Sequence, residues 1–577
     1  MILQALTDYY EDLVNQGRIA RPGWAKAKIS YALAVDEAGA LKQVIPLYEN
    51  IGKKKPQPQQ FDMPAPVKRT VGIVPNFLWD NSSYLLGVDN KEKDQEQEKE
   101  NRSVSCFKAA KELHHSILDG IESVTAKGIL SFFDCWDPQK AAEQPALAEN
   151  WDSIISGTNL TFRVNGVFAY EDELIRNAWQ EYYDKDEGEI QQCLVTGKDD
   201  VIAAVHPSIK GVDGAQSSGA AIVSFNAQAF CSYGQEQSYN APVGKYAAFA
   251  YTSALNYLLS DRENVQKIGD ASVVCWAEGA EQQYQKFTFA ALFGSKDDSF
   301  SEADLRAAVK KIANGESIPE QKLNSDKRCY ILGLSPNAAR ISVRFFYQDT
   351  FGNLMKNIYQ HYERMEIVRP SYDSFTTIPL WELLLETTRS NSSSDVSPVL
   401  AGAVARSIFT GGLYPAALIE QIQLRVRANH QINRGKAAII KAYYLRNTNA
   451  DCPKEVLTVA LNEQSTNPAY ILGRLFSVYE ALQEAANPGI NSTIKDKYFN
   501  SASATPALIF PVLNNLSQKH LRKLDDGKRI WYERQIMFLK NKIQDEYPTR
   551  FNLPQQGAFD LGYYHQTQKR YEKKEEK

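Results

Sequence analysis

The pattern of apolar residues changes at about residue 350, and this change limits what the chain can fold into. Before it, segments rich in Val, Ile, Phe and Tyr, such as 271–277 and 328–334, alternate with amphipathic stretches, which predicts strands mixed with helices. After it, apolar residues recur at helical spacing, as in 469–485. A chain of 577 residues is also too long for one core. We therefore predict an α+β, multidomain fold, with a mixed α/β N-terminal and central part followed by an all-α C-terminal helical bundle.

Individual elements follow from the same periodicities. Helices are expected at 2–16, 101–119, 243–259, 299–313, 416–429, 434–446, 469–485, 505–517 and 529–543, and strands within 28–47, 159–170, 271–277, 328–334 and 339–347. Segment 53–60 (KKKPQPQQ) is predicted to be a basic loop, 335–337 (Ser-Pro-Asn) a turn, and 89–100 (DNKEKDQEQEKE) a solvated connector.

These elements divide into four predicted regions. They are an N-terminal α+β unit with the basic loop (1–100), a central α+β domain (101–350), a helical connector (351–400) and a C-terminal helical bundle (401–577).

The sequence contains few features typical of an enzyme. The sequence lacks a phosphate-binding loop, a G-x-S-x-G elbow and an H-E-x-x-H helix, and its seven cysteines form no C-x-x-C pair. We expect a protein that is not an enzyme and that holds no metal or cofactor. The alternative is a nuclease, because the acids of 183–189 (YDKDEGE) could bind metal if a sheet brought them together. No apolar run reaches 18 residues and no secretory signal is visible, so we expect a cytoplasmic protein without membrane contact.

The most informative stretch is 211–259, whose first half is crowded with Gly, Ser, Asn and Gln. Amides and hydroxyls form hydrogen bonds but have little acid–base power, so this segment suits a surface that grips a ligand. A Gly-flanked polar turn can approach a backbone closely. Its candidate contact residues are Gln216, Ser217, Ser218 and Asn226.

A second stretch, 66–87, combines bases with amides. Lys68 and Arg69 precede a Gly-Ile-Val-Pro turn, and Asn76 and Asn81 flank a Phe-Leu-Trp segment. Bases bind phosphates and Asn side chains bond base edges. The alternative is a basic loop that leads into a buried strand, with Asn76 capping it, and residue chemistry alone favours this alternative.

The third stretch, 331–346, places Asn337 in a predicted turn and Arg340 and Arg344 on alternate positions of a strand. Arginines on one face could track a phosphate backbone, or they could form a salt-bridged sheet edge.

Basic residues are concentrated in the first part of the helical bundle. Between 401 and 450 there are seven bases and one acid. The candidate phosphate-binding residues are Arg425, Arg427, Arg434, Lys436 and Lys441. Structural or protein–protein roles remain open for all of them.

Several long segments resemble the large subunit of the type I-C CRISPR surveillance complex, Cascade. They include MILQALTDYYEDL, PVKRTVGIVPNFLWDN, GAQSSGAAIVSFNAQAFCSYGQEQSYNAP, AAFAYTSALNYLL, ILGLSPNAARISVRFF, GKAAIIKAYYLRN and LGYYHQTQKR. The resemblance extends over nearly the whole chain.

The resemblance implies a non-enzymatic role in a complex with guide RNA (crRNA), backbone subunits, a crRNA-processing and capping subunit, and small subunits. Guide pairing reads the target in such complexes, while protein reads the short flanking motif (PAM) on double-stranded DNA. The large subunit is implied to read this motif, promote duplex opening and R-loop formation, hold the displaced strand and help recruit a separate helicase–nuclease. The family also implies that the C-terminal part is made separately as a small subunit.

Read in this way, the candidate residues fall into two groups. Lys68, Arg69, Asn76, Asn81, Gln216, Ser217, Ser218, Asn226, Asn337 and Arg340 are the candidates for PAM and duplex contacts. Arg425, Arg427, Arg434, Lys436 and Lys441 are the candidates for the displaced strand.

Overall fold

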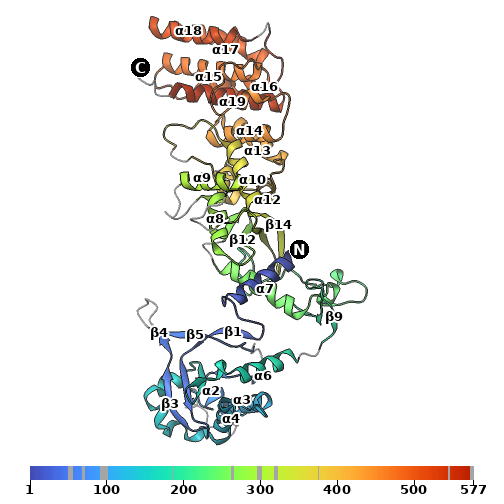
Figure 1. The fold of residues 1–577 in the computed structure, drawn as a ribbon. Coiled ribbons are helices and arrows are strands. Elements are labelled where there is room, and N and C mark those ends of the chain that lie inside the picture. The colour runs from blue at the N-terminus through green and yellow to red at the C-terminus, as the bar shows by residue number, and fades with distance from the viewer. Residues whose placement is uncertain are drawn as a thin grey trace. The chain divides into compact units, whose positions relative to one another are not determined.

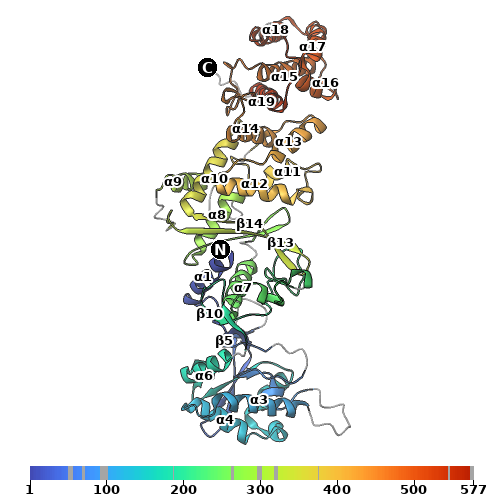
Figure 2. The same cartoon turned by 90° about the vertical axis from the view of Figure 1, so that its right-hand side faces the viewer.

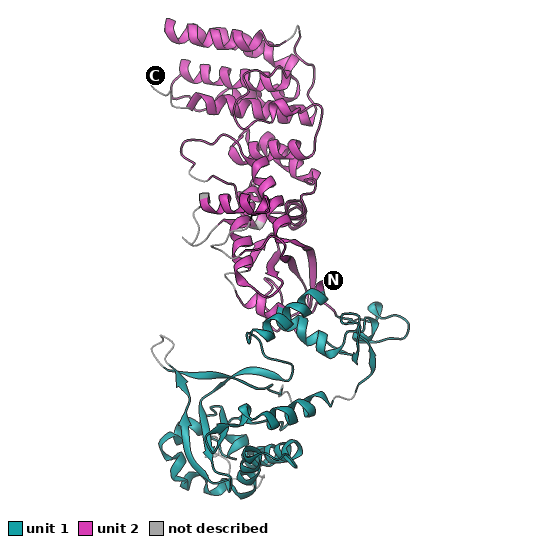
Figure 3. Cartoon of the chain, viewed as in Figure 1, with its two compact units in different colours: residues 1, 3–207, 224–254 teal, residues 2, 208–223, 255–577 magenta. Residues whose placement is uncertain are grey.

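The computed structural model describes residues 1–49, 56–67, 72–90, 102–185, 188–225, 227–261, 265–294, 302–316, 323–373, 376–543 and 546–571. The chain forms two compact units (Figure 3). Unit 1 holds residues 1, 3–207 and 224–254, and unit 2 holds residues 2, 208–223 and 255–577. Sheets and helices are mixed before residue 350, and in the described part no strand follows Thr350. The predicted α+β, multidomain fold with a helical C-terminal region is confirmed.

The described part of unit 1 contains three small sheets, two of which are built around the N-terminal strands. In the first, β1 (Trp24–Ile29), β5 (Gln57–Pro64) and β4 (Tyr48–Glu49) lie in the order β1-β5-β4. In the second, β3 (Leu41–Pro46), β2 (Tyr31–Val35), β7 (Leu160–Val164) and β6 (Trp79–Asp80) lie in that order, and β8 (Val167–Phe168) pairs with β7. Strand β2 runs parallel to β7, and the chain between them forms the helices that cover this sheet.

The helices of unit 1 bury an aromatic core. They are α1 (Ile2–Asn15), α2 (Ser82–Leu85), α3 (Arg102–Leu118), α4 (Val124–Cys135), α5 (Trp151–Ile155) and α6 (Glu173–Asp184). Helix α4 packs on β2 and β7, and its Phe132 and Phe133 contact Phe162 of β7 edge to face. A separate two-stranded sheet joins β9 (Ile190–Gln192) and β10 (Asp199–Val201). The division between the units falls within α7 (Lys245–Ser260).

Unit 2 begins with an antiparallel sheet of β11 (Gln266–Ile268), β12 (Ala271–Ala277), β13 (Arg328–Asn337) and β14 (Arg340–Thr350), in chain order. All seven residues of β12 are buried, which explains why its sequence is apolar apart from Ser272 and does not alternate. Helix α8 packs on β12, and α10 and α12 pack on β14 (Figures 1 and 2).

Helices make up the rest of unit 2. They are α8 (Gln282–Phe293), α9 (Glu302–Ala313), α10 (Phe351–Met365), α11 (Leu380–Leu385), α12 (Pro398–Thr410), α13 (Ala416–Asn429), α14 (Arg434–Arg446), α15 (Pro468–Ala486), α16 (Ile494–Ala504), α17 (Pro506–Leu521), α18 (Asp526–Lys540) and α19 (Leu553–Tyr571). Short 3-10 helices occur in both units. In unit 1 they lie at Pro138–Glu143, Pro145–Asn150, Ala169–Glu171, Gln228–Phe230 and Gln237–Asn240, and in unit 2 at Ser393–Asp395 and Lys454–Val456.

Helices α15 and α19 pack at very short range through two glycines. A Cβ atom built on Gly473 of α15 would lie 1.9 Å from the carbonyl oxygen of Phe559, and one on Gly562 of α19 would lie 2.1 Å from that of Tyr470. The ten residues from Gln556 to His565 of α19 are all buried. The last helix is therefore an internal element of the bundle.

Two predicted loops are wrong. Residues 57–60 belong to β5, whereas 53–55 lie outside the described residues. Ser335, Pro336 and Asn337 end β13, and the turn comes one step later at Ala338–Ala339, where Ala338 has a φ of 53°. Most of the predicted connector, 91–100, also lies outside the described residues. The four predicted domain ranges stay a prediction, and the sheet that contains β2 and β7 draws strands from both sides of residue 100.

Candidate nucleic-acid interface

In unit 2 the polar turn around Gln216 lies beside the tip of the β13–β14 hairpin. Ala221 bridges to Arg340, since Ile341 N–H donates to the Ala221 carbonyl at 2.9 Å and Ala221 N–H donates to the Ala339 carbonyl at 3.2 Å. The turn itself is closed by a 2.9 Å hydrogen bond from Gly219 N–H to the Gln216 carbonyl. Two segments that were selected separately from the sequence are thus one structural feature, which we call the hairpin-tip surface (Gln216–Ser218 and Asn337–Arg340).

The hairpin-tip surface offers exposed polar groups on a fixed backbone. Gln216, Ser217, Ser218 and Asn337 are exposed, and Arg340 is half-buried. Gly219 has a φ of 100°, and a Cβ there would lie 2.7 Å from the Cβ of Ser208, so only glycine fits this close turn. Amide, hydroxyl and guanidinium groups held in this way can bond base edges and phosphates.

The charged groups beside this surface are largely paired. Lys267 contacts Asp213 at 2.5 Å and Arg344 contacts Asp270 at 2.6 Å. A β-bulge between Gly333 and Leu334 leaves Arg344 without a partner position in the β13 ladder. Of the two arrangements predicted for Arg344, a face that tracks phosphates or a salt-bridged sheet edge, the structure contains the salt-bridged edge.

The amides of the N-terminal stretch are engaged within unit 1. Asn76 is buried, its Oδ1 accepts from Val67 N–H at 3.0 Å, and its own N–H donates to Asp80 Oδ2 at 2.9 Å. Asn81 is the N-cap of α2 and accepts from Ser83 N–H at 3.0 Å. Contacts of either side chain with DNA would compete with these bonds. Lys68, Arg69 and Asn226 lie outside the described residues.

Three bases of the predicted displaced-strand group are buried inside unit 2. Arg434 bonds Asp373 at 2.8 Å and the Thr376 carbonyl at 2.7 Å. Lys436 and Lys441 are 4% and 2% exposed, and their Nζ atoms donate to the carbonyls of Gln431 at 3.1 Å and Arg364 at 3.0 Å. Desolvation lowers the pKa of Lys441 to about 8. These side chains support the packing of α14, and a phosphate could reach them only if that packing opened.

The other two bases of that group lie on α13. Arg425 is half-buried and Arg427 is exposed. The Nη2 of Arg427 donates to Gln556 of α19 at 2.7 Å. The five bases therefore do not form one continuous cationic surface.

Beside Arg427 lies a buried acid that makes the stability of unit 2 depend on pH. Desolvation raises the pKa of Asp560 to about 7, although Gln423 donates to its Oδ2 at 2.8 Å. Because this pKa exceeds the unfolded value of about 3.9, the folded state binds the proton more tightly. The contribution of Asp560 to stability is therefore complete in acid and is lost as pH rises towards 7.

The variant Asp560→Asn tests this dependence, because it cannot ionise. Between about pH 5 and pH 8 the parent is expected to lose roughly 2–3 kcal/mol relative to the variant. Urea unfolding of both proteins at the two pH values measures the difference. A constant offset between the two curves would contradict the pKa shift.

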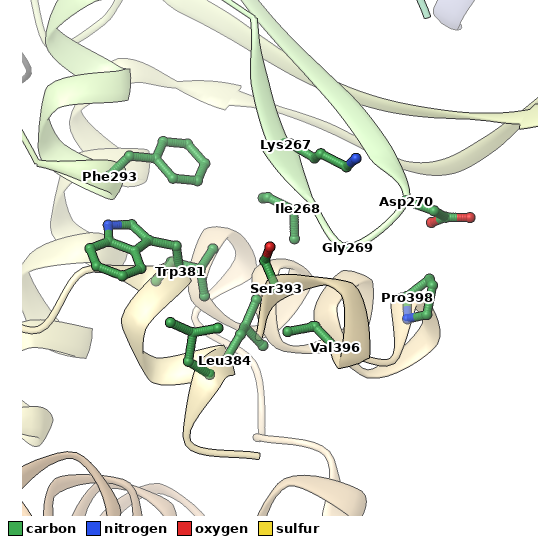
Figure 4. Close-up of a pocket in the computed structure, with 12 residues that line it drawn as sticks. Lys267, Ile268, Gly269, Asp270, Phe293, Trp381, Leu384, Ser393, Val396 and Pro398 are labelled. Carbon is green, nitrogen blue, oxygen red and sulfur yellow. The ribbon is translucent and has the colours of Figure 1, made fainter. Parts of the chain in front are cut away.

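Two pockets of unit 2 differ in chemistry. One of about 530 Å³ lies among the β11–β12 turn, α8, α11 and α12 (Figure 4). It is lined mainly by apolar groups such as Trp381, Phe293 and Leu384, and its two charged residues, Lys267 and Asp270, already form the ion pairs described above. This pocket offers little to a nucleic acid. The other, of about 910 Å³, is lined by aromatic and basic residues of α15, α18 and α19.

The residues of α18 that line this second pocket are not among the binding residues predicted from the sequence. The sequence signal for them is Trp531, Gln535 and Phe538, whose spacing places an amide and two aromatic rings on one helix face.

The described residues contain no group of three or more His, Cys, Asp or Glu side chains suited to a metal. Within the same part of the chain, none of the helices is both long enough and apolar enough to span a bilayer.

A comparison with protein-family models gives a match over nearly the whole chain. The family model described as CRISPR-associated protein (Cas_Csd1) matches residues 6–571. No curated protein matches the chain.

Proposed function

Because this chain belongs to the Cas_Csd1 family of CRISPR-associated proteins, the large subunits of type I-C Cascade, we propose that it recognises the PAM on target DNA through its hairpin-tip surface. In this role it would bind the duplex beside the target, promote its opening and R-loop formation, and act without catalysing a reaction itself. Its partners would be crRNA, the backbone subunits, the crRNA-processing subunit, the small subunits and a recruited helicase–nuclease, in the cytoplasm.

One observation supports this location above the others. Ala221 and Arg340 are 119 positions apart in the sequence, yet they are bridged, and exposed amides and hydroxyls lie on both sides of the bridge. Base recognition needs such groups held in fixed positions, since a hydrogen bond to a base edge depends on direction as well as on distance. A hairpin tip is also narrow enough to approach a groove.

The double variant Gln216→Ala/Asn337→Ala is expected to lose discrimination between duplexes. In the assembled complex, its preference for a PAM-bearing over a PAM-scrambled duplex should fall about ten-fold or more, because each base-edge contact contributes about 1–3 kcal/mol. Arg340→Ala should weaken binding to both duplexes similarly and reduce the salt dependence, as expected for a phosphate contact. Fluorescence anisotropy at several salt concentrations measures both effects.

The matched control is Asn515→Ala/Gln518→Ala, which removes an exposed Asn and Gln from α17 in the same unit. It should leave discrimination unchanged. Unchanged discrimination in the Gln216/Asn337 variant would refute the assignment of the hairpin tip. Metal-dependent cleavage of the labelled duplex by the purified chain would favour the alternative, a nuclease subunit.

Two further roles are part of the proposal. The C-terminal helices would be made separately as the small subunit, and the bundle would hold the displaced strand. Because Arg434, Lys436 and Lys441 are enclosed in the packing of α14, the second role needs another surface.

A further inference from the structure

The pocket of about 910 Å³ in unit 2 combines aromatic surface with buried positive charge. It lies among α15, α18 and α19. Its lining includes Glu463, Arg474, Trp531, Phe538, Lys569 and Arg570. Three of these are bases and one is an acid, so the lining favours an anionic ligand.

The aromatic wall is formed by α18. Trp531 is 53% exposed and Phe538 is 45% exposed, so both rings present surface that the protein leaves uncovered. Trp531 meets the ring of Tyr532 edge to face at 4.8 Å, and Tyr532 OH donates to the Ala481 carbonyl at 3.1 Å. The ring of Trp531 is thus positioned before any ligand arrives. Lys542 adds a cation 5.0 Å from the centroid of Phe538.

The opposite wall contains a buried arginine whose hydrogen-bond acceptors are neutral oxygens, while the Glu463 carboxylate acts on it through space. Arg474 is 3% exposed, its Nε donates to Gln566 Oε1 at 3.0 Å, and its Nη1 donates to the Asn462 carbonyl at 3.4 Å. Desolvation lowers the pKa of Arg474. Because its hydrogen-bond acceptors are neutral, this buried cation still gains free energy when a second anion arrives. The exposed Arg570 differs, since it contacts Glu484 at 2.7 Å.

We propose that this pocket binds an unpaired nucleobase together with its phosphate from a single-stranded nucleic acid. The base stacks on Trp531, and the phosphate contacts the exposed Lys569, while the buried Arg474 attracts it through space. Every base has a stacking face, so such a site accepts any sequence, as a subunit that holds a displaced strand requires. The assignment rests on the proposed function and gives the strand-holding role a surface other than α13 and α14.

The variants Trp531→Ala and Phe538→Ala in the full chain test the proposal. Both side chains are substantially exposed, so folding should persist, and circular dichroism checks this. Short fluorescent oligothymidylate and oligouridylate are the probes, at low salt, with anisotropy as the readout. Affinity should fall about ten-fold for Trp531→Ala and somewhat less for Phe538→Ala. Photocrosslinking of an iodouracil-containing oligonucleotide should label the peptide that contains Trp531.

The controls separate this site from its neighbours and from the duplex site. Met537 is 62% exposed on the same helix but does not line the pocket, so Met537→Ala should bind as the parent does. Recognition of a PAM-bearing duplex by the assembled complex should be unchanged in Trp531→Ala. An error in the pocket assignment can therefore be told apart from an error in the assignment of the hairpin-tip surface.

The outcomes divide clearly. Weaker binding of oligothymidylate identifies DNA as the ligand, and an effect confined to oligouridylate identifies RNA, and either supports the pocket. Parental affinity for both probes in Trp531→Ala, or failure of the parent chain to bind either probe, would overturn the proposal.

Discussion

Replacement of His114 by alanine is expected to destabilise unit 1 by about 3–5 kcal/mol. His114 is fully buried in α3, with ring centroids of Phe77 and Phe133 at 5.0 and 4.6 Å. Its Nε2 accepts from Leu78 N–H at 3.0 Å, so the proton is on Nδ1, which donates to the Ala110 carbonyl at 2.7 Å. Leu78 has a φ of 64°, a left-handed conformation that costs a leucine free energy.

Three contributions therefore act together in this variant. The alanine leaves a cavity among aromatic rings, it leaves a buried N–H without an acceptor, and it removes the group that stabilises the conformation of Leu78. Burial also lowers the pKa of His114 to about 4, so the ring stays neutral at neutral pH. Urea unfolding, together with hydrogen exchange of peptides from residues 72–90, measures the loss.

The adjacent residue provides a matched control. His115 lies on the exposed side of α3, where it contacts Asp119 at 3.0 Å and Asp134 at 3.2 Å. His115→Ala should cost less than about 1 kcal/mol, since solvent-accessible contacts with carboxylates contribute little. Similar costs for the two variants would show that His114 is not the anchor of Leu78.

Gly473→Ala is expected to destabilise the C-terminal helices by about 3 kcal/mol or more. The new Cβ would lie 1.9 Å from the Phe559 carbonyl oxygen, a backbone atom that cannot turn away as a flexible side chain could. Helices α15 and α19 would have to separate, and the buried surface on both would loosen. Thermal unfolding and hydrogen exchange of α19 peptides measure this effect, and Gly562→Ala should behave similarly.

Gly402→Ala is the control for this effect. Gly402 lies within α12, and its nearest neighbour to a built Cβ is Phe345 Cδ1 at 3.9 Å. The alanine should be neutral or stabilise the helix by about 0.5–1 kcal/mol, because it restricts the unfolded chain. A tolerated Gly473→Ala would mean that α15 and α19 pack less closely than described.

The sequence was informative where local chemistry decides the structure. Helices α13 and α14 begin and end at the predicted residues, since Pro415 precedes the first and Asn433 caps the second by accepting from Lys436 N–H. The exposed polar turn at Gln216 was also predicted as a surface feature. Its pairing with Arg340 was not, because no local pattern specifies a contact between segments so far apart.

The basic residues of the bundle show where such reasoning fails. The excess of bases along 401–450 predicts that Lys436 and Lys441 are surface groups. Lys441 follows Ile439 and Ile440, in a helix whose buried residues lie on all sides. In a helix that is buried on all sides, a lysine side chain is enclosed in every orientation. Its Nζ then needs carbonyl oxygens as hydrogen-bond acceptors, because an unpaired buried charge is costly. The aromatic residues of α18 show the reverse error. Trp and Phe in a helix usually indicate a core position, yet Trp531 and Phe538 are exposed.

The enclosed position of α19 has a consequence for biosynthesis. Helix α15 is complete at Ala486, but the part of α19 that it packs against extends to His565. At about 5–20 residues per second, a ribosome needs roughly 4–16 s to supply the missing helix. For that interval, we expect the apolar residues of α15 that α19 later covers to stay exposed on the nascent polypeptide, where chaperones can bind them.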